Sequence, residues 1–210
     1  MGFNGLTRPG GDDLLARAAA AAGVPFVLST ASNERLEKVA EPRRELNWLQ
    51  LYVMRERSIA EQIVRRARAA GYGALRGGVR FVAAYPITPA TELLEWMAPA
   101  LTKVGGTLLQ AEDELASVNM IIGAAYGGVP SLTATAGPGL ALMTEAIGLA
   151  VSAEVPIVVV DVMRGGPSTG IPAKSEQSDL SFAVSGLHGD APRLVLAPTS
   201  IADCLATTHW

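Results

Sequence analysis

The sequence predicts an α/β three-layer sandwich around a mostly parallel β-sheet. Along all 210 residues, short β-branched runs flanked by glycine or proline alternate with longer Ala-, Leu- and Glu-rich stretches of helical period. Apolar residues make up 49% of the chain and charged residues only 18%, so most element surfaces must be covered by other elements. A strand followed by a helix, repeated with short connections, is typical of parallel βα units whose sheet is covered on both faces.

The individual elements follow from this alternation. The periodic Ala-, Leu- and Glu-rich stretches predict helices at 12–22, 34–41, 56–77, 89–102, 112–127, 139–152 and 199–208. The β-branched runs between them predict strands at 25–29, 47–52, 80–84, 106–110, 131–135, 156–161 and 193–197. Residues 157–160 are all β-branched and apolar, so we expect this strand to be fully buried at the centre of the sheet.

Charge and cysteine content exclude several partners and cofactors. A net charge of -3 lacks the basic footprint of a nucleic-acid or anionic-membrane binder. Segment 115–144 carries no charge, but its breaks at 129–131 and 137–139 indicate helix, strand, loop and helix rather than a membrane span. A single cysteine, Cys204, permits neither an internal disulfide nor an iron–sulfur cluster held by this chain alone, and no metal site is predicted. Residues 1–11 lack the pattern of a signal peptide, so the expected location is the cytoplasm.

The charges divide the chain into two unlike parts. Residues 1–79 carry 12 Lys/Arg and 8 Asp/Glu, whereas residues 80–210 carry 5 Lys/Arg and 12 Asp/Glu. This asymmetry indicates a composite origin.

The first part carries short motifs along nearly its whole length. They are GFNGL at 2–6, RPGGD at 8–12, VPFVLSTASN at 24–33 and QLY at 50–52. Together they resemble the FMN-dependent α-hydroxy-acid oxidase and dehydrogenase family, whose members are TIM barrels. The resemblance implies flavin contacts for Ser29 and Gln50 and a substrate-facing position for Tyr52. We expect Ser29 and Gln50 at or near strand ends, where barrel sites are assembled.

This barrel resemblance is incomplete. The first barrel strand and the later βα units, which carry the family's catalytic histidine and phosphate-binding end, have no counterpart in this chain. FMN binding is therefore not expected, and Ser29, Gln50 and Tyr52 are interpreted as a vestigial flavin site. A partial barrel cannot close, so its strands must pair with other elements; the alternative is that residues 1–55 dock loosely or stay unfolded.

The second part carries five motifs in order. They are GGVRFVAAYPITPATE at 77–92, EDE at 112–114, TAGPG at 135–139, RGGPSTG at 164–170 and AP at 197–198. These motifs resemble the α subunit of 2-oxoacid:ferredoxin oxidoreductases, in the domain that binds the pyrimidine half of thiamine pyrophosphate (thiamine diphosphate). The chain then divides into a partial barrel fragment at 1–77 and a pyrimidine-binding domain at 78–210. Both pieces are expected to be shorter than the domains they resemble.

Three side chains in these motifs are the candidate catalytic residues. Thr88 lies between two prolines after a strand, in a turn that fixes its hydroxyl at the carboxyl edge of the sheet, and the resemblance implies contact with the 2-oxoacid and thiazolium region. Glu114 matches the carboxylate that hydrogen-bonds the aminopyrimidine and promotes loss of the C2 proton; a helix-capping role stays open because Glu112, Asp113 and Glu114 begin the helix together. Arg164 matches the anchor for the substrate carboxylate, a role suited to a guanidinium.

Two glycine-rich segments stay ambiguous. Gly137, Pro138 and Gly139 would let the backbone approach thiamine closely, or they form an ordinary helix-entry turn. The run at 165–170 is either a lid or a long βα loop. Asp161, Lys174, Glu176, Asp179 and His188 flank the region and receive no role.

The resemblance also implies partners. In the family, a domain usually found on the β subunit holds the diphosphate and Mg2+, and a partner carries the clusters that pass electrons to ferredoxin; a homo-oligomer stays open. The chain is therefore expected to derive from a thiamine-dependent 2-oxoacid:ferredoxin oxidoreductase α subunit that is inactive alone. The alternatives are an FMN-dependent 2-hydroxy-acid oxidoreductase remnant and a chimeric chain without biochemical function.

Overall fold

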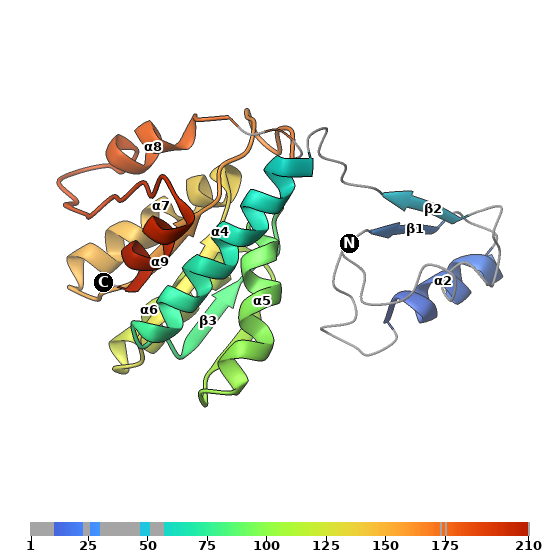
Figure 1. Cartoon of the computed structure of the whole chain (residues 1–210), viewed down its shortest axis with the longest axis horizontal. Helices are drawn as coiled ribbons and strands as arrows, with labels where there is room; N and C mark the ends of the chain where they lie inside the picture. Colours follow the sequence, from blue (N-terminus) through green and yellow to red (C-terminus); the bar gives the residue numbers. More distant parts are fainter. Residues whose placement is uncertain are drawn as a thin grey trace. The chain divides into compact units, whose positions relative to one another are not determined.

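The computed structural model describes residues 11–22, 26–29, 47–50, 57–172, 174 and 176–209. The chain separates into two compact units, Met1–Val53 and Met54–Trp210, which are described one at a time (Figure 1).

The described part of the first unit is one helix and two strands. Helix α2 (Gly11–Ala22) precedes the parallel strands β1 (Phe26–Ser29) and β2 (Asn47–Gln50). An ion pair of 3.1 Å between Arg17 Nε and Asp13 Oδ2 spans one turn of α2. Strands β1 and β2 form a two-stranded sheet of their own. The predicted helix 34–41 lies outside the described residues.

The second unit is built on a four-stranded parallel sheet. The strands are β3 (Phe81–Ala84), β4 (Thr107–Gln110), β5 (Ser131–Thr135) and β6 (Val158–Asp161), in the order β4-β3-β5-β6. The helices are α4 (Arg57–Arg76), α5 (Thr91–Thr102), α6 (Glu114–Tyr126), α7 (Gly137–Ser152), α8 (Asp179–Ser185) and α9 (Ile201–His209). Among the helices described, none combines the length and apolar character that crossing a membrane requires.

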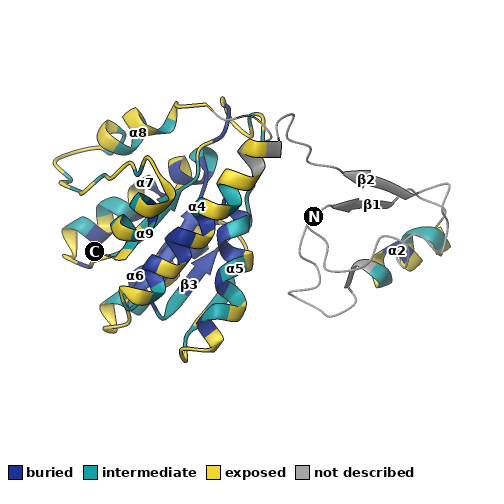
Figure 2. Cartoon of the chain, in the orientation of Figure 1, coloured by how far each residue is buried: buried dark blue, intermediate teal, exposed yellow. Residues whose placement is uncertain are grey.

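Helices cover both faces of this sheet, which confirms the three-layer α/β prediction. Strand residues alternate between the two faces. Val160 packs with the cluster formed by α4, α5 and Cys204 of α9, whereas its neighbour Val159 packs with the cluster formed by α6 and α7. Figure 2 shows the buried residues concentrated where these helices meet the strands.

Two expectations for this unit are wrong, and one helix was missed. Strand β6 is an edge strand of the described sheet rather than a central one, and Val158 is 42% exposed. Residues 193–197 form no strand: Leu194 is 84% exposed, and no described strand pairs with this segment. Helix α8 was not predicted, because seven residues are too few for a clear helical period.

Helices α4 and α9 pack closely through small residues. The hydroxyl of Thr208 on α9 donates to the carbonyl of Ala70 on α4 at 2.9 Å. A Cβ added at Gly73 of α4 would collide with Thr208 Oγ1 and the carbonyl oxygen of Leu205. Glycine at this position therefore sets the distance between the two helices.

We predict that Gly73→Ala lowers the free energy of unfolding by about 1–3 kcal/mol, because the Leu205 carbonyl cannot move out of the way. Gly123→Ala on α6 is the matched control, since nothing lies within 4 Å of the added Cβ. It should raise stability by about 0.5–1 kcal/mol. Urea unfolding followed by circular dichroism measures both, and equal effects of the two substitutions would contradict this account of the α4–α9 contact.

Candidate functional site

The candidate residues follow the carboxyl ends of the four strands. Thr88 comes after β3, Glu114 begins the helix after β4, Gly137 begins the helix after β5, and Arg164 follows β6. All four strands run in parallel, so their carboxyl ends lie at the same edge of the sheet. Open parallel α/β sheets bind their ligands at this edge.

Arg164 links two of these connections directly. Its side chain is buried, and Nη1 donates to the backbone oxygen of Thr88 at 2.9 Å. The loop after β6 is thereby tied to the turn after β3, across β5. This hydrogen bond restricts the orientation of the planar guanidinium.

Glu114 is buried and feels the charge of Arg164. The residue is only 7% exposed. Burial raises the pKa of its carboxyl above the ordinary value; the charge of Asp113 adds to this rise, whereas a backbone hydrogen bond and the guanidinium of Arg164 oppose it. The structure thus brings Thr88, Glu114 and Arg164 together.

The capping of α6 is carried by another residue. The N-cap is Asp113, whose Oδ1 accepts a hydrogen bond from the amide of Ala116 at 2.7 Å. Glu114 is the first residue of the helix and gains from its positive end, but the side-chain cap does not require it.

The glycines of the 137–139 turn are needed by the fold itself. A Cβ added at Gly139 would collide with Thr135 Oγ1 and lie 2.9 Å from Glu114 Oε1. A Cβ added at Gly137 would lie 2.7 Å from Cγ of Asp179. Close packing of these side chains is thus one physical reason for both glycines; contact of Gly137, Pro138 and Gly139 with a cofactor remains a prediction.

Sequence reasoning missed a carboxyl pair at this edge. Asp161 is the last residue of β6 and Asp179 is the first of α8. Burial raises the pKa of Asp161 to about 7, with further contributions from the charge of Asp179 and a hydrogen bond between the two side chains. The sequence signal for this pair is Asp161 itself, a charged residue at the end of an apolar strand, where ligands bind to parallel sheets.

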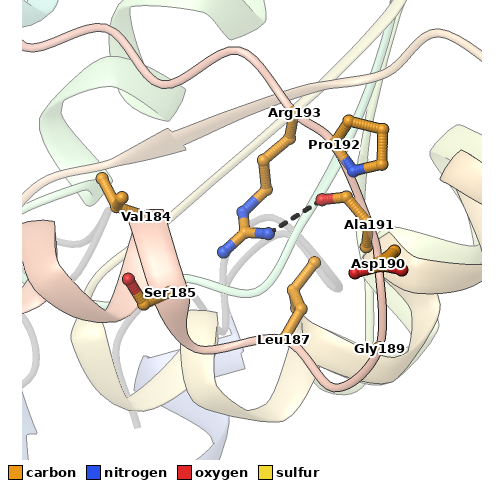
Figure 3. A pocket seen from close by; sticks show the side chains of 8 residues that line it. All are labelled: Val184, Ser185, Leu187, Gly189, Asp190, Ala191, Pro192 and Arg193. Carbon is orange, nitrogen blue, oxygen red and sulfur yellow. Dashed lines mark hydrogen bonds between the residues drawn. The ribbon is translucent and has the colours of Figure 1, made fainter.

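A surface pocket of about 460 Å³ lies in the segment that includes the end of α8 and the residues after it (Figure 3). Arg193 lines this pocket, and its Nε and Nη1 donate to the carbonyls of Ala183 and Ala191 at 2.6 and 3.0 Å. Both hydrogen bonds go to the backbone, so Arg193 holds this segment to the end of α8.

Two residues expected to contact a flavin lie in the first unit. Ser29 ends β1, Gln50 ends β2, and they are partners in the strand register. Their positions at strand ends are as predicted. Tyr52 lies outside the described residues.

The fold and the buried polar edge define an α/β ligand-binding domain with a parallel sheet. Residues 72–210 match the family model described as pyruvate flavodoxin/ferredoxin oxidoreductase, thiamine diphosphate-binding. The chain belongs to this family, as the motifs in its second part indicated. Residues 1–79 also match the family model described as FMN-dependent dehydrogenase.

Named relatives agree with this family. The chain is 50% identical over 136 residues to the 2-oxoglutarate synthase subunit KorA of Methanocaldococcus jannaschii, covering 65% of this chain and 37% of the relative. It is 45% identical to the 2-oxoacid:ferredoxin oxidoreductase 1 α subunit of Sulfurisphaera tokodaii, covering 68% of this chain and 25% of the relative.

A solved structure is also similar. It is the 2-oxoglutarate:ferredoxin oxidoreductase from Magnetococcus marinus with 2-oxoglutarate, coenzyme A and succinyl-CoA bound, with 55% identity and a TM-score of 0.67. The match covers 68% of this chain and 25% of that chain. The present chain therefore spans well under half the length of these relatives.

We predict that Glu114→Gln reduces the pH dependence of stability. The folded-state pKa of Glu114 is raised, so the folded protein keeps a proton that the unfolded chain loses, and the free energy of unfolding falls as pH rises from the ordinary glutamate pKa through the raised value. Gln cannot titrate. Urea unfolding at about pH 4 and about pH 8 should therefore give a smaller difference in the variant than in the parent.

The exposed Glu112→Gln is the matched control for this experiment. It removes a neighbouring carboxylate that remains in water, and it should keep the parental pH dependence. An unchanged pH dependence in Glu114→Gln would show that burial of this carboxyl has no effect on its titration.

Proposed function

We propose that residues 78–210 are the pyrimidine-binding half of a thiamine diphosphate site, derived from the α subunit of a 2-oxoacid:ferredoxin oxidoreductase. The observation that carries this proposal is the meeting of Arg164, Thr88 and Glu114 at one sheet edge. The complete enzyme would convert a 2-oxoacid to an acyl-CoA by oxidative decarboxylation with a β subunit. Residues 1–77 would be a barrel fragment outside this activity, and the chain alone would be inactive.

The residues at the edge fit the pyrimidine half of the cofactor. Burial raises the pKa of Glu114, so its carboxyl keeps a proton to a higher pH than an exposed glutamate does and is better suited to proton exchange with an aromatic nitrogen. Glu114 would therefore hold the aminopyrimidine ring, and the tight contact with Gly139 would fix the carboxyl in place. When bound, thiamine diphosphate supplies the carbanion stabilisation that decarboxylation of a 2-oxoacid requires.

Arg164 would hold the carboxylate of the 2-oxoacid. A guanidinium pairs with a carboxylate through parallel N–H donors, and a buried site strengthens this pairing. The hydrogen bond to Thr88 restricts the arginine before substrate arrives, so less side-chain freedom is lost on binding. Thr88 itself would lie against the reacting end of the substrate.

A β subunit would supply the diphosphate and Mg2+ binding groups, and a partner would pass electrons to ferredoxin. Support for a subunit partner comes from helices α6 and α7, which expose several large apolar side chains. These are Leu115, Met120, Tyr126, Leu142 and Leu149. Such side chains are unusual on a surface that stays in water. We expect the cytoplasm as the location.

The second candidate function is flavin-dependent oxidation of a 2-hydroxy acid. It is favoured by the match of residues 1–79 to the FMN-dependent dehydrogenase model and by the pairing of Ser29 with Gln50. Purified protein that carried a flavin would be yellow, so an absorbance spectrum tests this candidate directly. A colourless protein that fails to bind added FMN would exclude it.

We predict that the chain gains 2-oxoacid-dependent dye reduction only when a β subunit of the family and thiamine diphosphate with Mg2+ are added. In this mixture Glu114→Gln should lower kcat by about 100-fold or more, because the carboxyl that exchanges the proton is lost. Arg164→Lys should mainly raise KM for the 2-oxoacid, because the bidentate pairing is lost.

Glu112→Gln serves again as the control and should keep parental activity. Equal activity of Glu114→Gln and the parent would remove Glu114 from its proposed role. Calorimetry with thiamine diphosphate and Mg2+ in the presence of the β subunit, showing no binding to the parental chain, would overturn the proposed function as a whole.

A further inference from the structure

The loop that carries Arg164 begins and ends at two aspartates. It runs from residue 162 to residue 178, between Asp161 at the end of β6 and Asp179 at the start of α8. Inside the loop, the amide of Gly165 donates to the carbonyl of Lys174 at 2.8 Å, and the amide of Gly166 donates to Glu176 Oε2 at 3.1 Å. These hydrogen bonds hold the loop together. The start of the loop is attached to the sheet, because the amide of Val162 donates to the carbonyl of Thr135 at 2.8 Å, whereas the contact of Asp179 with Asp161 holds its other end.

The two aspartates meet beneath this loop. Their side chains are hydrogen-bonded to each other. Asp161 Oδ1 and Asp179 Oδ2 are both buried, and neither accepts a hydrogen bond from any other described residue. Asp179 also packs against Gly137, where an added Cβ would lie 2.8 Å from Oδ2. Its carboxyl therefore lies against the start of α7.

A contact between two carboxyl groups needs a proton. When both are ionised, each offers only acceptors and like charges repel at short range; when one is protonated, its O–H donates to the other. Burial and the charge of Asp179 both raise the pKa of Asp161, which titrates at about 7. The contact is therefore favoured below neutral pH and weakened above it.

The other charged groups of the loop and of the neighbouring elements have contacts of their own or lie farther along their elements, and Lys174 of the loop is exposed. In the loop, Arg164 interacts with Thr88 and Glu114, and Glu176 accepts from the Gly166 amide. On α6, Glu114 interacts with Arg164 and Asp113. On β5, the register partner of Asp161 is the uncharged Thr135, and the first charged residue of α7 is Glu145, two turns from its start.

We propose that Asp161 and Asp179 form a proton-linked staple that closes the base of the 162–178 loop and positions Arg164. At its other end, α8 is tied to the segment that follows it, because Arg193 donates to the carbonyl of Ala183. Loss of the shared proton separates the loop ends, because two ionised carboxylates repel each other. Only the consequence for substrate rests on the proposed function; the staple itself does not.

Limited trypsin digestion of the full chain tests the staple. Lys174 is an exposed residue of the loop, and Lys103 at the end of α5 is an exposed reference site. Cleavage after Lys174, measured by mass spectrometry relative to cleavage after Lys103, should increase about tenfold from pH 6 to pH 8. This is the change in the deprotonated fraction of a group that titrates near 7.

Asp179→Asn separates this mechanism from a general effect of pH. An asparagine amide donates to the Asp161 carboxylate without a titrating proton, so the relative cleavage should stay low at both pH values. Asp161→Asn is the reciprocal variant and should behave in the same way. Asp190→Asn removes an exposed carboxylate and should keep the parental tenfold change. The staple would be overturned if relative cleavage after Lys174 did not change with pH in the parent. It would also be overturned if Asp179→Asn showed the same change with pH as the parent.

The effect on Arg164 is read in the chain reconstituted with a β subunit. In the parent, KM for the 2-oxoacid should rise between pH 6 and pH 8, whereas in Asp179→Asn it should stay constant while kcat follows the parental profile. A KM that rises equally in both would overturn the positioning role. A reconstituted protein without activity would count against the proposed function alone, because the digestion still decides on the staple.

Discussion

The parallel direction of four strands is the constraint on which the site depends. Residues separated by more than seventy positions in the sequence reach the same edge because β3, β5 and β6 end there together. The hydrogen bond from Arg164 to the Thr88 carbonyl is possible only in this arrangement, since it joins connections on either side of β5. Reversing one strand would move its following loop to the opposite edge. Each polar residue belongs to a short sequence motif, but the residues of different motifs can act together only because the strand order brings them to one edge.

Much of the second unit could be predicted because its signals are local. Helix and strand periods located α4–α7 and β3–β6 to within a few residues, and parallel topology anticipated that Thr88, Glu114 and Arg164 would meet. What failed depends on long-range partners. The β-branched apolar run at 157–160 indicates burial, but not whether another strand lies beside it, and strand β6 is at an edge of the described sheet. Residues 193–197 have strand composition but no pairing partner among the described strands. The Asp161–Asp179 contact joins residues across a loop, so no periodicity reveals it.

Three buried carboxyl groups of the second unit change its stability with pH in the same direction. Burial is the largest cause of the raised pKa of Glu92, Glu114 and Asp161. Each favours a folded state that retains a proton, so each contributes less stability as pH rises toward neutrality. A fold selected for stability alone would place such groups in water. Their position near helix starts and strand ends, at a cost in stability, is typical of sites whose carboxyl groups exchange protons above the ordinary pH range of a carboxyl.

Helix α4 crosses the boundary between the stretches that match the two family models. Most of it lies only within the stretch that matches the FMN-dependent dehydrogenase model, yet it packs on α5 and α9 in the unit that matches the thiamine family. Its buried face is formed largely by Ala67, Ala69, Ala70 and Ala74, and small residues make few demands on the shape of a partner. Glycine refines the contact, at Gly71 beside Trp96 and at Gly73 beside Leu205. Residues 57–71, which lie outside the match to the thiamine family model, can therefore still help to cover this sheet, because a face of small residues fits closely against its partners. The polar edge of the sheet depends instead on specific hydrogen bonds.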